Sequence, residues 1–95
     1  MDINSLRAEI DSIDDRLVRL FSERMRVSAG IARYKAENNL PVYDKSREQI
    51  KLTDILNKTD ADLHVYMEML YTRIFELSRS FQESRISMWQ GKESQ

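Results

Sequence analysis

The feature that most constrains the fold is a long segment, from about Asp2 to Asn38, that contains no proline and a single glycine, Gly30. Its apolar side chains recur at alternating steps of three and four residues, at Ile3, Leu6, Ile10, Ile13, Leu17, Leu20, Val27, Ile31 and Tyr34. This spacing puts them on one face of an α-helix. The segment therefore predicts one long helix, over about residues 2–38, with an apolar stripe along it.

Such a helix is too long for this chain to cover by itself. At ~1.5 Å per residue it would extend on the order of 55 Å, whereas a compact chain of this length has a radius of gyration of about 12 to 13 Å. We therefore expect part of the stripe to pack on a second copy, in an intertwined homodimer. A simple helical hairpin with a frayed end is the alternative.

A break separates this helix from the rest of the chain, with a loop over residues 39–44. Asn38 and Asn39 can end a helix, and Pro41 disfavours helical geometry in the residue before it. Asp44 is a suitable N-cap for a second helix, over about residues 45–57. Its buried side is expected to carry Ile50, Ile55 and Leu56.

A third helix is predicted over about residues 60–86, where Thr59 and Asp62 resemble a capping box. Its predicted buried seam consists of Leu63, Met67, Leu70, Ile74, Leu77 and Phe81, and a second stripe changes from apolar to polar through Tyr71, Phe75, Ser78 and Gln82. The polar tail, residues 87–95, is expected to be loose. The sequence thus predicts a single all-α domain over residues 1–95, with three helices.

Composition narrows the functional classes. The chain has no cysteine and one histidine, so we expect neither a disulfide framework nor a metal site, and no cofactor. Fifteen basic and sixteen acidic residues nearly cancel, which argues against nonspecific nucleic-acid binding. No apolar run approaches the roughly 18 residues of a membrane span, and the N-terminus lacks a signal-peptide core. We expect a soluble cytoplasmic protein, either free-standing or part of a bifunctional one.

Arg24 interrupts the apolar stripe of the first helix. A buried guanidinium is costly unless an anion lies beside it. Arg24 therefore suggests an anionic ligand, although it could also extend to water or pair with Glu23. Lys35 follows eleven residues later, about three turns along the helix, so both cations project from nearly the same face.

Other polar residues lie beside apolar stripes of the two shorter helices. Glu48 is in register with Leu52 and Ile55, so its carboxylate should approach the core and need a donor there. Ser78 and Gln82 continue a stripe that begins apolar. Each has a structural alternative, since Lys35 and Arg47 could face water, Ser78 could bond to its own helix and Gln82 could end a seam. Together they indicate a polar pocket.

Arg7 lies seventeen residues before Arg24, hence roughly 25 Å away along the same helix axis. One small ligand cannot touch both side chains of a single chain. If Arg7 serves the pocket, it must come from a partner subunit, and the pair would hold two equivalent sites.

These residues resemble the all-helical bacterial chorismate mutases, the type II family. The resemblance covers nearly the whole chain. It is carried by Leu6-Arg7, Ile10-Asp11-Ser12-Ile13-Asp14, Glu23-Arg24, Lys35, Pro41-Val42-Tyr43-Asp44, Arg47-Glu48 and Ser78-Arg79-Ser80-Phe81-Gln82.

The resemblance implies a three-helix protomer, an intertwined homodimer and conversion of chorismate to prephenate in phenylalanine and tyrosine biosynthesis. It also implies roles for the cations. Arg7 would reach a substrate carboxylate from the partner, and Arg24 would bind a carboxylate within its own chain. Arg47 would support the carboxylate side.

The resemblance implies further roles around the reacting bond. Lys35 and Gln82 would flank the ether oxygen, Glu48 and the region of Asp44 would accept the ring hydroxyl, and Ser78 would add a hydrogen bond to a carboxylate. Lys35, Gln82, Arg24 and Glu48 are thus the predicted catalytic residues.

Two other functions fit the same features. A lyase on the same scaffold that removes pyruvate from isochorismate would need the same cations, although Glu48 favours the mutase. A helical dimerisation or regulatory module would need no catalysis and would bind no cyclic dicarboxylate.

Overall fold

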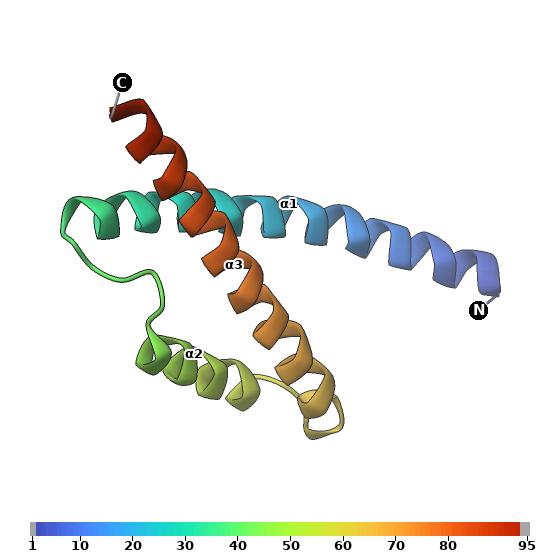
Figure 1. Cartoon of the computed structure of the whole chain (residues 1–95). Coiled ribbons are helices and arrows are strands. Elements are labelled where there is room, and N and C mark those ends of the chain that lie inside the picture. Colours follow the sequence, from blue (N-terminus) through green and yellow to red (C-terminus); the bar gives the residue numbers. More distant parts are fainter. Residues whose placement is uncertain (1, 94–95) are drawn as a thin grey trace.

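The computed structural model of the protein describes residues 2–93, which form three α-helices and one short 3₁₀ turn (Figure 1). The elements are α1 (Ile3–Glu37), α2 (Lys45–Asn57), η1 (Ala61–Leu63) and α3 (His64–Glu93). No strand occurs within residues 2–93. The predicted all-α class with one long N-terminal helix is therefore confirmed.

Side chains at its two ends define α1. The carboxylate of Asp2 accepts a hydrogen bond from the Ser5 backbone N–H at 2.8 Å, which satisfies one of the free donors of the first turn. At the other end Asn38 is the C-cap, and Asn39 has a φ of 55°, in the left-handed region. Asparagine enters this region more readily than most residues, so the chain leaves the helix here.

The start of α2 follows the prediction, whereas the start of α3 does not. The Asp44 carboxylate caps α2 by accepting from the Arg47 N–H at 3.0 Å. The predicted Thr59–Asp62 capping box is wrong, because the N-cap is Asp60 and has no side-chain cap hydrogen bond, while the Thr59 hydroxyl donates back to the Ile55 carbonyl at 2.7 Å. A 3₁₀ turn therefore precedes α3, which begins at His64.

The prediction of a loose tail is wrong over residues 87–93, because α3 continues to Glu93. Packing against the end of α1 explains the extension. Ile86 and Trp89 line a groove together with Arg33 and Ala36, and the Arg33 guanidinium lies 5.0 Å from the centroid of the Trp89 ring. Residues 94–95 lie outside the described range.

In Figure 1, α3 crosses the C-terminal half of α1, and α2 packs against α3. Within residues 2–91, whose burial is described, the buried side chains are Ser28, Ala32, Phe75, Ser78 and Gln82. The second stripe of α3 therefore meets α1. The predicted buried seam of the third helix is partly exposed, since Leu63 and Leu70 are 47% and 51% exposed. Ile50, which was predicted to be buried on α2, is also exposed.

The N-terminal half of α1 projects away from the other helices (Figure 1). The molecule measures 60 × 28 × 15 Å with a radius of gyration of 17.1 Å, against about 12 Å for a compact chain of this length. All nine apolar residues of the α1 stripe, from Ile3 to Tyr34, are exposed. The chain is thus not a hairpin closed on its own stripe.

Among the described helices, none is both long and apolar enough to cross a membrane.

Candidate active site

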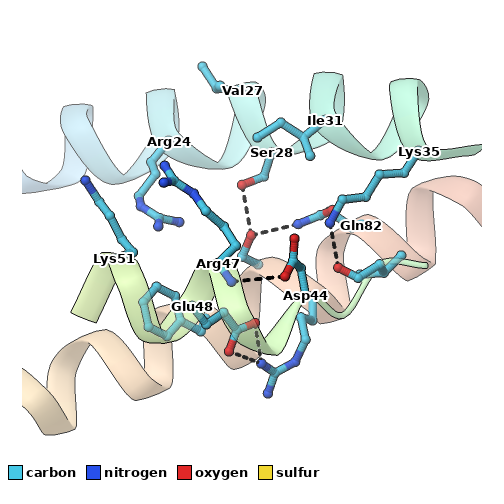
Figure 2. A pocket seen from close by; sticks show the side chains of 14 residues that line it. Arg24, Val27, Ser28, Ile31, Lys35, Asp44, Arg47, Glu48, Lys51 and Gln82 are labelled. Atoms are coloured by element: carbon cyan, nitrogen blue, oxygen red, sulfur yellow. Dashed lines mark hydrogen bonds and ion pairs between the residues drawn. The ribbon is translucent and has the colours of Figure 1, made fainter. Parts of the chain in front are cut away.

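A cavity of about 280 Å³ lies between α1, α2, α3 and the loop that leads into α2 (Figure 2). Its walls bring together residues that are far apart in the sequence. They are Arg24, Val27, Ser28, Ile31, Lys35, Val42, Asp44, Arg47, Glu48, Lys51, Phe75, Ser78, Arg79 and Gln82.

The lining of this cavity carries more positive than negative charge. Five of its side chains are cationic, and only two, Asp44 and Glu48, are acidic. In Figure 2 the side chains of Arg24, Arg47 and Lys51 extend into the space between α1 and α2. Within residues 2–93 Arg24 forms no ion pair with Glu23. A cleft of this charge favours a small anion.

Lys35 is fixed at the other end of the cavity. Its Nζ donates a 2.7 Å hydrogen bond to the Val42 carbonyl, so the side chain connects α1 to the loop that precedes α2. An ammonium group has three donors, and this contact uses one of them. Lys35 can therefore donate to a ligand while the loop holds it in place.

A chain of buried hydrogen bonds joins α1 to α3 beside the cavity. The hydroxyls of Ser28 and Ser78 lie 2.9 Å apart, and Gln82 Nε2 donates to Ser78 Oγ at 3.0 Å. Gln82 is only 6% exposed, and its Oε1 has no hydrogen-bond partner within residues 2–93. Because half a turn of the amide exchanges Oε1 and Nε2, Gln82 can offer a ligand either an acceptor or a donor.

The donor that Glu48 was expected to need is Arg79. Its Nη1 lies 2.5 Å from Oε1 and 2.6 Å from Oε2 of Glu48, across the gap between α3 and α2. The hydrogen bond to Glu48 is the main cause that raises the pKa of the Arg79 guanidinium above its usual value. The same guanidinium lies 4.6 Å from the centroid of the Tyr43 ring.

Seven of the eight predicted site residues line this one cavity, namely Arg24, Lys35, Asp44, Arg47, Glu48, Ser78 and Gln82. Arg7 does not, because it lies on the projecting half of α1, where it is exposed. The roles assigned to these residues stay predictions.

Sequence reasoning did not assign three polar lining residues, Ser28, Lys51 and Arg79. Helical spacing could have found Ser28, which is one turn after Arg24 and two turns before Lys35. Lys51 follows Arg47 at the same one-turn step, and its Nζ lies 3.7 Å from Asp54 Oδ2. Arg79 had no comparable signal, because its contact with Glu48 joins two helices.

The fold and the cavity define a class of protein: an all-helical chain with a preformed cationic pocket at the crossing of its helices. The chain belongs to the chorismate mutase type II family, whose sequence model matches residues 6–83. This range contains all eight predicted site residues.

Similar proteins carry this domain within longer chains. A bifunctional chorismate mutase/prephenate dehydratase of Buchnera aphidicola subsp. Schizaphis graminum is 36% identical over 80 residues, which is 81% of this chain and 20% of the relative. The protein of the same name from Aquifex aeolicus is 33% identical over 79 residues, 73% of this chain and 22% of the relative. The chain thus spans about a fifth of these relatives.

The T-protein of Haemophilus influenzae is 37% identical over 46 residues, 48% of this chain and 12% of that protein. No solved structure was found to match the chain.

Proposed function

We propose that this chain is a chorismate mutase, which rearranges chorismate to prephenate. The observation that carries the proposal is the convergence of Arg24 and Lys35 from α1 with Gln82 from α3 in one cavity of excess positive charge. Membership of the chorismate mutase type II family supports it, as do the names of the related proteins.

The chemistry of this rearrangement suits such a pocket. Chorismate carries two carboxylates, and its side chain must fold over the ring before one C–O bond breaks as a C–C bond forms. The step needs no nucleophile and no proton transfer. Cations such as Arg24 and Arg47 can hold the carboxylates in the reactive geometry, and orientation of this kind removes several kcal/mol of barrier.

Two donors serve the ether oxygen in this proposal. Negative charge grows on that oxygen as the C–O bond breaks, and donors already in position stabilise it without reorganising. Lys35, held by the Val42 carbonyl, and Gln82, buried beside Ser78, are these donors. Ser78 binds a carboxylate, and Glu48 with the region of Asp44 accepts the ring hydroxyl.

The proposed active unit is an intertwined homodimer. The exposed apolar stripe along α1 supports this, because a monomer rarely leaves such a contiguous apolar surface in water. In the dimer, Arg7 of one subunit completes the pocket of the other, which gives two equivalent sites. A cytoplasmic location, expected from the sequence, stays a prediction.

An assay with two substrates tests the activity. The protein is incubated separately with chorismate and with isochorismate, and the products are identified by mass spectrometry. We expect prephenate from chorismate. Pyruvate release from isochorismate without prephenate would instead favour the lyase, and no product from either substrate would favour a non-catalytic module.

Two matched arginine variants accompany this assay. Arg24→Ala should abolish most prephenate formation. Arg73→Ala should not, because Arg73 is exposed on α3, pairs with Glu76 and lies outside the cavity.

A further inference from the structure

Arg79 is a cation in the pocket wall with no role in the function proposed above. Its Nη1 bonds to both carboxylate oxygens of Glu48, at 2.5 and 2.6 Å, and both side chains are about three-quarters buried, with 28% and 23% of their surface exposed. Partial burial makes the pair less screened by solvent than the exposed pairs of this protein. The contact therefore influences the charge that a ligand meets at Glu48.

The position of Arg79 is fixed from two directions. Glu48 on α2 binds the guanidinium, and the Tyr43 ring, in the loop before α2, lies 4.6 Å from it. A cation over an aromatic face is held by the ring quadrupole. Arg79 thus joins α3 to α2 and to the loop.

The pair leaves Glu48 able to accept a further hydrogen bond. A carboxylate offers about four lone-pair sites, and Nη1 occupies one on each oxygen. The remaining sites stay free for a neutral donor. Because Arg79 balances the negative charge of Glu48, such a donor can belong to a molecule that itself carries two carboxylates, without strong repulsion between like charges.

We propose that Arg79 is a specificity-determining positioning residue, which fixes and neutralises Glu48 so that the pocket accepts a dianion whose ring bears a neutral hydroxyl. This inference rests on the proposed function. Without Arg79, Glu48 loses the guanidinium that binds both of its carboxylate oxygens, so its negative charge is less balanced. The pocket then disfavours the hydroxyl substrate and favours a ring substituent that is positively charged.

The test compares two substrates in one set of variants. They are chorismate and the analogue in which a protonated amino group replaces the ring hydroxyl. For Arg79→Gln we expect kcat/KM for chorismate to fall at least tenfold, mainly through a higher KM. The value for the amino analogue should fall less or rise, so the ratio of the two values shifts by tenfold or more.

Three further variants separate positioning from general structural damage. Arg79→Lys keeps the charge and should restore most of the preference for chorismate. Arg73→Gln, a matched loss of charge on the same helix, should leave the ratio unchanged. In the Glu48→Gln background, Arg79→Gln should have little further effect on the ratio, because position 48 then carries no negative charge for Arg79 to balance.

Each outcome bears on a different claim. If the parent protein converts neither substrate, the proposed function fails. If it forms prephenate but Arg79→Gln lowers kcat/KM equally for both substrates, or leaves kcat/KM for chorismate unchanged, the role of Arg79 is refuted. Circular dichroism of Arg79→Gln and Arg79→Lys checks the fold, and Arg79→Lys provides the test if Arg79→Gln does not fold: a tenfold change of the ratio in this variant would refute a role based on charge.

Discussion

At the scale of single residues, the site is defined by polar groups that the fold holds in fixed positions. Lys35 is held by the Val42 carbonyl, Gln82 by Ser78, and Glu48 by Arg79. Each contact fixes a side chain while leaving it some capacity for a ligand. Donors positioned in advance in this way are most effective in a reaction that depends on orientation and on charge that appears only in the transition state.

Lys35→Ala is expected to lower turnover by about 10² to 10³, because losing one preorganised donor costs roughly 3 to 4 kcal/mol of transition-state stabilisation. Steady-state kinetics with chorismate measure this loss, and sedimentation checks that assembly is unchanged. Near-normal turnover in a folded, assembled variant would show that Lys35 does not serve the ether oxygen.

Gln82→Glu is expected to make activity depend on acid. The introduced carboxyl can donate a hydrogen bond only while protonated, so turnover should rise as the pH falls below its pKa and be lost as the pH rises through it. At neutral pH the ionised carboxyl would also repel the growing charge on the ether oxygen. The pH–rate profiles of the variant and the parent, recorded side by side, check this, and superimposable profiles would rule out Gln82 as that donor.

At the scale of elements, the segment between α1 and α2 matters most for the pocket. It contains the left-handed Asn39, the carbonyl of Val42 that binds Lys35, and the N-cap Asp44. The path of these few residues determines where α2 begins. It therefore also determines where Arg47, Glu48 and Lys51 enter the cavity.

Asn39→Ala is expected to destabilise the fold by about 1 kcal/mol, because an alanine Cβ is disfavoured at positive φ, whereas Asn39→Gly should be tolerated or slightly stabilising. Urea unfolding at one fixed protein concentration compares the two variants with the parent. Equal stability of the alanine and glycine variants would mean that this residue does not need the left-handed conformation.

At the scale of the whole molecule, the single chain buries little apolar surface. The apolar stripe along α1 is exposed and Arg7 lies away from the cavity. A second copy would cover the stripe and bring a further cation to each site. The two features have one common explanation in the proposed homodimer.

Mixed dimers test this assembly directly. Arg7→Ala and Arg24→Ala should each be nearly inactive alone. Refolded together in equal amounts, they should regain about a quarter of the parent activity, since half of the dimers are mixed and each mixed dimer holds one intact site of two. Sedimentation of the same sample should give twice the chain mass. A monomer, or a mixture without recovery, would contradict a site shared between subunits.

The sequence by itself determined the all-α class, the long first helix and the end of that helix near Asn38. These depend on local properties, namely the 3.6-residue period, the caps and the proline. Such properties are visible in the sequence without knowledge of contacts between distant residues. The polar residues beside apolar stripes likewise indicated Arg24, Lys35, Glu48 and Gln82, because a charge or amide on a buried face needs a partner.

Only the tertiary structure decided which stripe of α3 is buried, why that helix continues to Glu93 and what binds Glu48. Ser28 and Ala32 on α1 meet Phe75, Ser78 and Gln82, so the stripe that ends in polar residues is the buried one, whereas the more apolar seam is partly exposed. Arg33 packs on Trp89, and Arg79 reaches Glu48 from another helix. Contacts of this kind join residues distant in sequence, and the angle at which the helices cross selects them, which no local pattern specifies.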